Sequence, residues 1–118
     1  GVDVDALHRQ LVSVMEDGLY REYDLTLGKL AANLSVSTHQ LSQLLNERLR
    51  MKFSDFVNQY RVEEAKRLLQ SEDGRNVLSV CFHVGFNSKS AFNAAFRKLT
   101  GSVPKDYRPR RSEDGASD

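Results

Sequence analysis

The sequence predicts an all-α protein in which two helix-turn-helix subdomains are joined by a long linker helix. Two stretches, residues 26–48 and 77–100, share one layout: a short apolar helix, a tight turn and a second helix with a polar outer face. Between them, residues 53–70 form the longest helical pattern of the chain. A single helical hairpin is common and would be a weak signal. Two hairpins with matching polar outer faces indicate a repeated helix-turn-helix motif.

The composition is that of a globular protein and excludes several kinds of segment and site. The chain has 118 residues, 40% hydrophobic and 28% charged, which suits one domain or two small subdomains. No apolar run approaches the ~20 residues of a membrane-spanning helix, and there is no signal-peptide pattern, so we expect a cytoplasmic protein. The single cysteine, Cys81, excludes an internal disulfide and a multi-cysteine zinc site, and we expect it to be a small buried residue.

The charge of the chain is unevenly distributed. The formal net charge is only +1, but residues 25–111 carry 15 Lys and Arg against 7 Asp and Glu. The first 24 residues and the last seven are acidic instead. A basic body of this kind attracts polyanions through phosphate neutralisation and counterion release, although a solvated surface of mixed charges would have the same composition.

The first 24 residues predict an amphipathic helix followed by a polar loop. Val4, Leu7 and Leu11 recur at helical spacing, and Gly18 is a suitable stop. Residues 20–24 read as the loop. We expect the helix to lie on the first subdomain and also to connect to an upstream sensing or dimerisation module that is missing from this sequence.

The first helix-turn-helix covers residues 26–48. Its inner face is predicted at Leu27, Leu30 and Ala31 on the first helix and at Leu41, Leu44 and Leu45 on the second. Residues 34–36 make the turn, and Ser37 caps the second helix. The side chains left outward on that helix are Thr38, His39, Ser42, Gln43 and Asn46.

The long helical pattern over residues 53–70 has apolar positions for both neighbours and a favourable i,i+4 pair at Glu63 and Arg67. At 1.5 Å per residue, the seventeen residues 53–69 would make a rod of roughly 25 Å, the right order to separate two reading helices by one DNA turn. Residues 71–76 are predicted to be a turn.

The second helix-turn-helix covers residues 77–100. Its first helix stops at Gly85, Ser88 caps the next, and Phe92 and Phe96 share an inner face. The side chains left outward are Lys89, Ser90, Asn93 and Arg97. A closing helix is expected over residues 104–108, with Pro104 in its first turn, and residues 112–118 read as a disordered tail.

These motifs resemble a known family. From residue 25 to residue 108 the chain is similar to the DNA-binding domain of the AraC/XylS family of bacterial transcription regulators. The resemblance is carried by L-A-A-N-L-S-V-S-T-H-Q-L-S-Q-L-L-N, R-V-E-E-A-K-R-L-L, V-G-F-N-S-K-S-A-F-N-A-A-F-R-K and G-S-V-P-K-D-Y-R. The last two are highly specific in combination.

The resemblance implies sequence-specific binding of double-stranded DNA through two major-groove helices, with recruitment of RNA polymerase and transcription activation as the output. The residues expected at bases are Thr38, His39, Ser42, Gln43, Lys89, Ser90 and Asn93. Those expected at phosphates are Ser37, Asn46, Arg50, Arg61, Ser88, Arg97, Lys98 and Arg108. Arg61 is expected to have a structural role as well.

Three positions depart from the family pattern. Leu45 replaces a large aromatic as a core substitution. Ala94 stands where a longer polar side chain is frequent, so we expect the outer helix of the second motif to read fewer bases. Arg50 replaces a glycine at the end of the first reading helix, where a left-handed conformation would cost an Arg roughly 1 kcal/mol more than Gly. The sequence leaves open whether Arg50 accepts this conformation or forms another turn.

Other functions compete with DNA binding. No nucleophile with a paired base, Gly-rich phosphate loop or metal-ligand cluster is visible, so we expect neither an enzyme nor a cofactor or metal. A helical protein-interaction module with vestigial DNA binding is the alternative. The amino-acid sequences of several segments also resemble those of family members whose upstream module is membrane-embedded. A membrane-embedded upstream module is therefore a further hypothesis.

Overall fold

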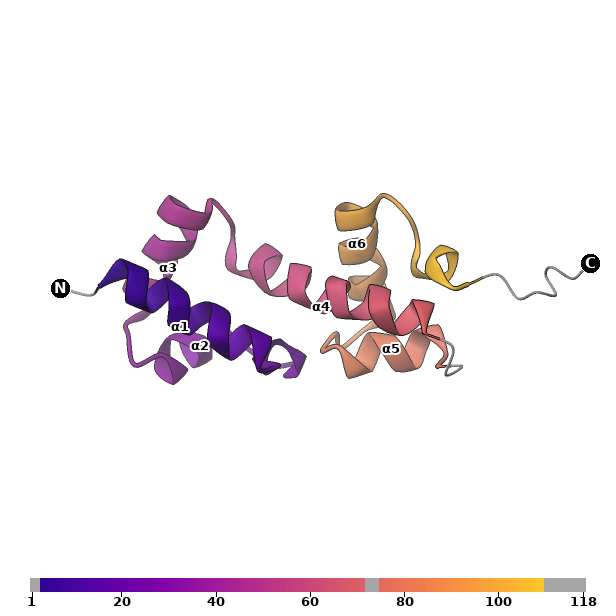
Figure 1. The fold of residues 1–118 in the computed structure, drawn as a ribbon, viewed down its shortest axis with the longest axis horizontal. Helices are drawn as coiled ribbons and strands as arrows, with labels where there is room; N and C mark the ends of the chain where they lie inside the picture. Colours follow the sequence, from indigo (N-terminus) through magenta and orange to yellow (C-terminus); the bar gives the residue numbers. More distant parts are fainter. Residues whose placement is uncertain (1–2, 72–74, 110–118) are drawn as a thin grey trace, which may run out of the picture. The chain divides into compact units, whose positions relative to one another are not determined.

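The computed structural model describes residues 3–71 and 75–109 and is helical throughout its regular structure (Figure 1). The predicted all-α class is confirmed. The chain divides into two compact units, Gly1–Tyr60 and Arg61–Asp118. The predicted tail over residues 112–118 and the middle of the predicted 71–76 turn lie outside the described residues.

The first unit contains α1 (Val4–Glu16), α2 (Leu27–Asn33) and α3 (Thr38–Gln43). A π-helical segment, η2 (Leu44–Leu49), follows α3 directly, so the predicted second helix of this motif is an α-helical turn continued by a π-helical one. α4 (Phe53–Gln70) starts in this unit and ends in the second. Its bounds match the expected long helix, while its role as a spacer stays a prediction.

The core of the first unit is built from the predicted inner faces. Leu30 and Ala31 of α2 and Leu41, Leu44 and Leu45 of the second helix are buried, as predicted. α1 adds its own apolar stripe to the same core, with these residues buried: Leu7, Leu11 and Met15. The expectation that the N-terminal helix lies on the first subdomain is therefore confirmed.

The predicted polar loop at residues 20–24 was partly wrong. Leu19–Arg21 form a 3-10 turn, η1, and the side chain of Tyr20 is only 5% exposed. Its ring stacks on Tyr60 with 5.8 Å between the centroids. A tyrosine supplies a large apolar ring as well as a hydroxyl, so it enters the core where a neighbouring ring accepts it. Burial and the nearby charge of Glu16 raise the pKa of Tyr60.

The second unit comprises the rest of α4 with α5 (Val77–His83), α6 (Lys89–Thr100) and the 3-10 turn η3 (Pro104–Tyr107). Its core includes an aromatic series in which successive ring centroids lie 5.2, 5.7 and 5.0 Å apart: Phe86, Phe92, Phe96 and Tyr107. The predicted closing helix is therefore present, although it ends at Tyr107 rather than at residue 108.

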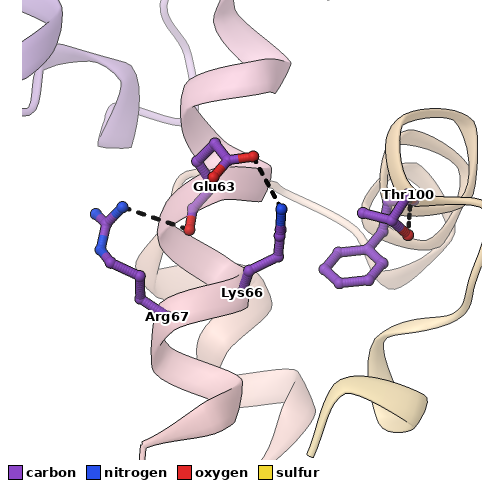
Figure 2. A network of polar contacts seen from close by, with 5 residues as sticks. Glu63, Lys66, Arg67 and Thr100 are labelled. Atoms are coloured by element: carbon purple, nitrogen blue, oxygen red, sulfur yellow. Dashed lines mark hydrogen bonds and ion pairs between the residues drawn. The ribbon is translucent and has the colours of Figure 1, made fainter.

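One predicted ion pair on the surface of α4 is wrong (Figure 2). Glu63 was expected to pair with Arg67. Instead, the Glu63 carboxylate accepts from Lys66 Nζ at 3.1 Å, and Arg67 Nη1 donates to the backbone oxygen of Glu63 at 3.5 Å. Residues three apart are also neighbours on a helix, and Lys66 lies 5.9 Å from the centre of the Tyr107 ring, which favours its position.

Both helix-turn-helix turns use one hydrogen-bond pattern. In the first, Ser35 N–H donates to Ala32 O and Val36 N–H to Ala31 O; in the second, Gly85 and Phe86 donate to the matching carbonyls of α5. This is the Schellman arrangement, which needs a left-handed residue. Gly85 meets the need with φ 113°, whereas Ser35 adopts φ 60° despite its Cβ.

We therefore expect Ser35→Gly to raise the free energy of unfolding by about 1 kcal/mol, because glycine adopts the left-handed conformation without the steric cost. Chemical denaturation monitored by circular dichroism would measure this. Gly85→Ala is the matched control in the second unit and should lower stability by a similar amount. A destabilising Ser35→Gly would show that the serine side chain stabilises the turn.

The buried cysteine offers a second test. Cys81 is 0% exposed, and burial raises the pKa of its thiol, so the reactive thiolate is scarce at neutral pH. We expect a thiol-reactive dye to label the native protein at least about tenfold more slowly than the unfolded chain. Because the chain has no other cysteine, labelling reports opening of the second unit. Equal rates with and without denaturant would contradict the burial of Cys81.

Candidate nucleic-acid interface

The two predicted N-caps are confirmed, and they define where each outer helix begins. Ser37 Oγ accepts from the Gln40 backbone N–H at 3.0 Å, and Gln40 Oε1 accepts from the Ser37 N–H at 2.9 Å. This reciprocal pair is a capping box. Ser88 Oγ accepts from the Ala91 N–H at 3.0 Å. Both hydroxyls are engaged in caps, and their expected phosphate contacts stay predictions.

The outer surface of α3 presents the predicted polar side chains. Thr38, His39 and Gln43 are exposed, and Ser42 is half-buried. Asn46 follows in η2, where its Nδ2 donates to Ser42 Oγ at 3.3 Å. The burial of the opposite side of the helix leaves this polar surface facing away from the core of the unit.

Two charged residues of this surface were missed by the sequence analysis. Glu47 accepts from Gln43 Nε2, with 3.4 Å to Oε1 and 3.5 Å to Oε2. Arg48 Nη1 lies 2.6 Å from Asp5 Oδ1 and so ties the end of η2 to the start of α1. The i,i+4 spacing of Gln43 and Glu47 was a usable signal, whereas nothing in the sequence links Asp5 to Arg48.

A groove runs between these elements of the first unit, with a volume of about 550 Å³. It is lined by Val4, Gln40, Gln43, Leu44, Glu47 and Arg48. Gln43 and Glu47 therefore share one concave surface beside α3, and α1 forms part of its wall.

The outer surface of α6 differs in charge. Lys89, Ser90, Arg97 and Lys98 are exposed and Asn93 is half-buried, as the predicted orientation requires. The helix contains no acidic residue, and Ala94 adds an exposed methyl group to its outer side. Cationic side chains without nearby acids on the same helix are suited to phosphate contacts.

Two arginines expected at phosphates are engaged inside the second unit. The Arg61 guanidinium carbon lies 5.5 Å from the centre of the Phe86 ring, and desolvation lowers the pKa of its half-buried group. Arg108 Nη1 donates to the backbone oxygen of Arg75, joining the end of η3 to the start of the α5 region. These contacts give both residues a structural role, and their phosphate contacts remain predictions.

The structure answers the open question at Arg50. Its backbone has φ 57° and ψ 40°, so the arginine accepts the left-handed conformation, and the following Met51 N–H donates to Leu45 O at 3.0 Å. The Arg50 side chain is exposed. A charged side chain thus stands at the end of η2 at a conformational cost.

The described residues, 3–71 and 75–109, also bear on other kinds of site. No group of three or more His, Cys, Asp and Glu side chains is arranged to hold a metal ion there. Within the same ranges, no helix combines the length and apolar character needed to cross a membrane.

Comparison with known proteins connects the chain to transcription regulators. The sequence model of a family described as a helix-turn-helix domain matches residues 30–110. An uncharacterized HTH-type transcriptional regulator of Staphylococcus aureus (strain MSSA476) is 32% identical over 93 residues, which are 79% of this chain and 12% of the relative. The chain thus spans about 12% of the length of this curated relative.

Solved structures share the fold. The C-terminal domain of AraT, a response regulator from Geobacillus stearothermophilus, matches with a TM-score of 0.77 and 28% identity, covering 86% of this chain and 83% of that one. An AraC-type DNA-binding domain-containing transcriptional regulator from Chromobacterium violaceum matches with a TM-score of 0.76 and 22% identity, covering 97% and 96%. The second likeness concerns the fold alone.

Replacing Arg50 tests the cost of its backbone. We expect Arg50→Gly to raise the free energy of unfolding by about 1 kcal/mol, because the left-handed strain is removed. Arg50→Ala keeps a Cβ and should show no such gain, so it isolates the backbone effect from loss of the charge. Denaturant titration of the two variants measures the difference. Equal stabilities would show that the turn carries no strain at this position.

Proposed function

Since the chain belongs to the AraC-type helix-turn-helix family of transcription regulators, we propose that it binds specific sequences of double-stranded DNA and so regulates transcription. In this proposal, each unit places one helix in the major groove: α3 with η2 from the first unit and α6 from the second. The expected output is activation by recruitment of RNA polymerase.

One observation carries the proposal. In both units, a helix begins at a serine cap directly after a left-handed turn, buries one apolar stripe and leaves polar side chains outward. A helix held in this way presents hydrogen-bonding groups along the side that faces away from the core of its unit. Such groups are what direct reading of base edges requires.

The proposed base contacts follow the outward side chains. On the first helix they are Thr38, His39, Ser42 and Gln43, and on α6 they are Lys89, Ser90 and Asn93. The exposed position of most of these residues supports the assignment. Gln43 has the strongest chemical case among them, because a glutamine amide can pair bidentately with adenine.

The two helices differ in charge, and we assign them different contributions. α6 carries Lys89, Arg97 and Lys98 and no acid. On the first helix, Glu47 is negative and Arg48 is paired with Asp5. α6 should therefore supply more of the salt-dependent affinity, while the first helix contributes more to the choice of sequence.

Further parts of the proposal concern the whole protein. The domain would act in the cytoplasm, under the control of an upstream sensing or dimerisation module, which in the membrane-embedded hypothesis would tether it. The small share of the curated relative that this chain spans is consistent with further modules in such proteins.

The alternative proposal is a protein-interaction module with vestigial DNA binding. It is favoured by one observation: Leu78 and Phe82, four residues apart on α5, are 48% and 52% exposed. An exposed apolar pair of this kind suits a protein partner better than a polyanion. Binding to that partner would depend little on salt, unlike binding to DNA.

Selection from a pool of random duplexes, followed by fluorescence anisotropy at several salt concentrations, tests the proposal. We expect an enriched site with two short elements about one helical turn, ~34 Å, apart and an affinity that falls steeply with salt. We propose that Lys89 neutralises a phosphate in addition to its base contact, and that Arg97 neutralises another. Lys89→Ala and Arg97→Ala should then each reduce the slope of log affinity against log salt concentration by about 1.

Gln43→Ala serves as the matched control, because it should change the preferred sequence and leave the salt slope intact. Binding without any enriched sequence would contradict specific recognition by this chain. No binding even at low salt would exclude the DNA proposal and favour the protein-interaction module.

A further inference from the structure

Gln43 and Glu47 form a pair of exposed side chains at the junction of α3 and η2. Gln43 Nε2 lies 3.4 Å from one oxygen of the Glu47 carboxylate and 3.5 Å from the other, so the amide nitrogen faces the carboxylate nearly symmetrically. Arg48, the next residue, is held by Asp5 at 2.6 Å. The carboxylate is therefore directed to the glutamine and not to its cationic neighbour.

The charge of Glu47 determines which way the Gln43 amide points. A glutamine amide has a donor side and an acceptor side of nearly equal shape, and a free side chain can present either of them. Beside an ionised carboxylate, only the N–H side is attracted, because the amide oxygen would be repelled. Gln43 Oε1 is consequently turned away from Glu47.

We propose that Glu47 is a positioning residue that makes Gln43 read an exocyclic amino group, adenine N6 or cytosine N4, in the major groove. The inference rests on the proposed DNA binding and adds the chemical class of base to it. Adenine and cytosine offer amino donors at this edge, whereas guanine O6 and thymine O4 are acceptors that would face the acceptor Oε1. The second N–H of Gln43 stays available for adenine N7.

An acidic residue beside DNA has no benefit through charge alone. Glu47 repels phosphates and so lowers affinity for every sequence equally. Holding one amide in a single orientation, however, removes ordering cost from the correct contact and penalises the wrong one. Immobilising a side chain of this kind corresponds to roughly a three- to tenfold effect on binding.

The test uses duplex selection and affinity measurements on the wild-type chain, Glu47→Ala, Glu47→Gln, Gln43→Ala and the double variant Gln43→Ala/Glu47→Ala. The base pair read by Gln43 is first identified as the one whose preference is lost in Gln43→Ala. Each base pair holds one exocyclic amino group and one keto oxygen in the major groove, so the two bases of this pair are then replaced in turn by analogues that lack only that group: purine for adenine, pyrimidin-2-one for cytosine, 5-methylpyrimidin-2-one for thymine and 2-aminopurine for guanine. We expect wild-type affinity to fall when the amino group is removed and to stay nearly unchanged when the keto oxygen is removed. In Glu47→Ala, the preference for this base pair over the reversed pair, in which the amino and keto groups exchange places, should be reduced roughly three- to tenfold.

Two comparisons separate positioning from charge. Glu47→Gln removes the negative charge but keeps an acceptor, so it should raise affinity while retaining more discrimination than Glu47→Ala. In the double variant, loss of Glu47 should have no further effect on base preference, because the residue acts through Gln43. A stability measurement confirms that each variant is folded.

Several results would overturn the inference. If wild-type affinity depends on the keto oxygen of this base pair and not on its amino group, the assigned polarity is wrong. If both Glu47 variants raise affinity alike and leave base preference unchanged, Glu47 acts by charge only. A site that loses no base preference in Gln43→Ala contradicts readout by Gln43 while leaving specific DNA binding intact, whereas failure of the wild type to enrich any sequence overturns this inference together with the proposed function.

Discussion

Burial of one apolar stripe on each outer helix is the constraint on which the rest of the structure depends. In the first unit, Leu41, Leu44 and Leu45 are at most 3% exposed, and in the second Phe92 and Phe96 are fully buried. Because a helix carries its stripe on one side, burying that side fixes its rotation about its own axis. The polar residues between the apolar ones must then lie on the side of the helix that faces away from the core. The candidate interface is thus a consequence of core formation, with no separate scaffold needed.

The same architecture is reached at different conformational cost in the two units. Helix ends in the second unit use glycine for the left-handed conformation, at Gly85 and Gly101. The corresponding ends in the first unit use Ser35 and Arg50, whose side chains make that conformation cost roughly 1–2 kcal/mol each. α1 offsets this cost, because burying residues such as Leu7 and Leu11 contributes about 1.5–3 kcal/mol apiece. The N-terminal helix is therefore part of what keeps α3 and η2 in place.

Electrostatics divides the two outer surfaces further. α6 presents cations on a helix free of acids, whereas the surface of α3 and η2 has its acid, Glu47, beside Gln43 and its cation, Arg48, beside Asp5. A surface of the first kind is suited to phosphates of any sequence, and one of the second kind is suited to contacts that depend on hydrogen-bond geometry. The net charge of +1 hides this difference because it averages over surfaces with different chemistry.

The sequence by itself determined the features that depend on residues three to five positions apart. The serine caps, both turns, the buried stripes and the outward set from Thr38 to Lys98 follow from helical periodicity and local hydrogen bonds. Only the tertiary structure decided which distant groups meet: Tyr20 stacks on Tyr60, Asp5 binds Arg48, Arg61 covers Phe86 and Arg108 donates to Arg75. Each of these contacts depends on the packing of whole helices, which brings together residues with no shared spacing in the chain. For the same reason, sequence alone identified most candidate contact residues but could not tell which arginines are already engaged inside the fold.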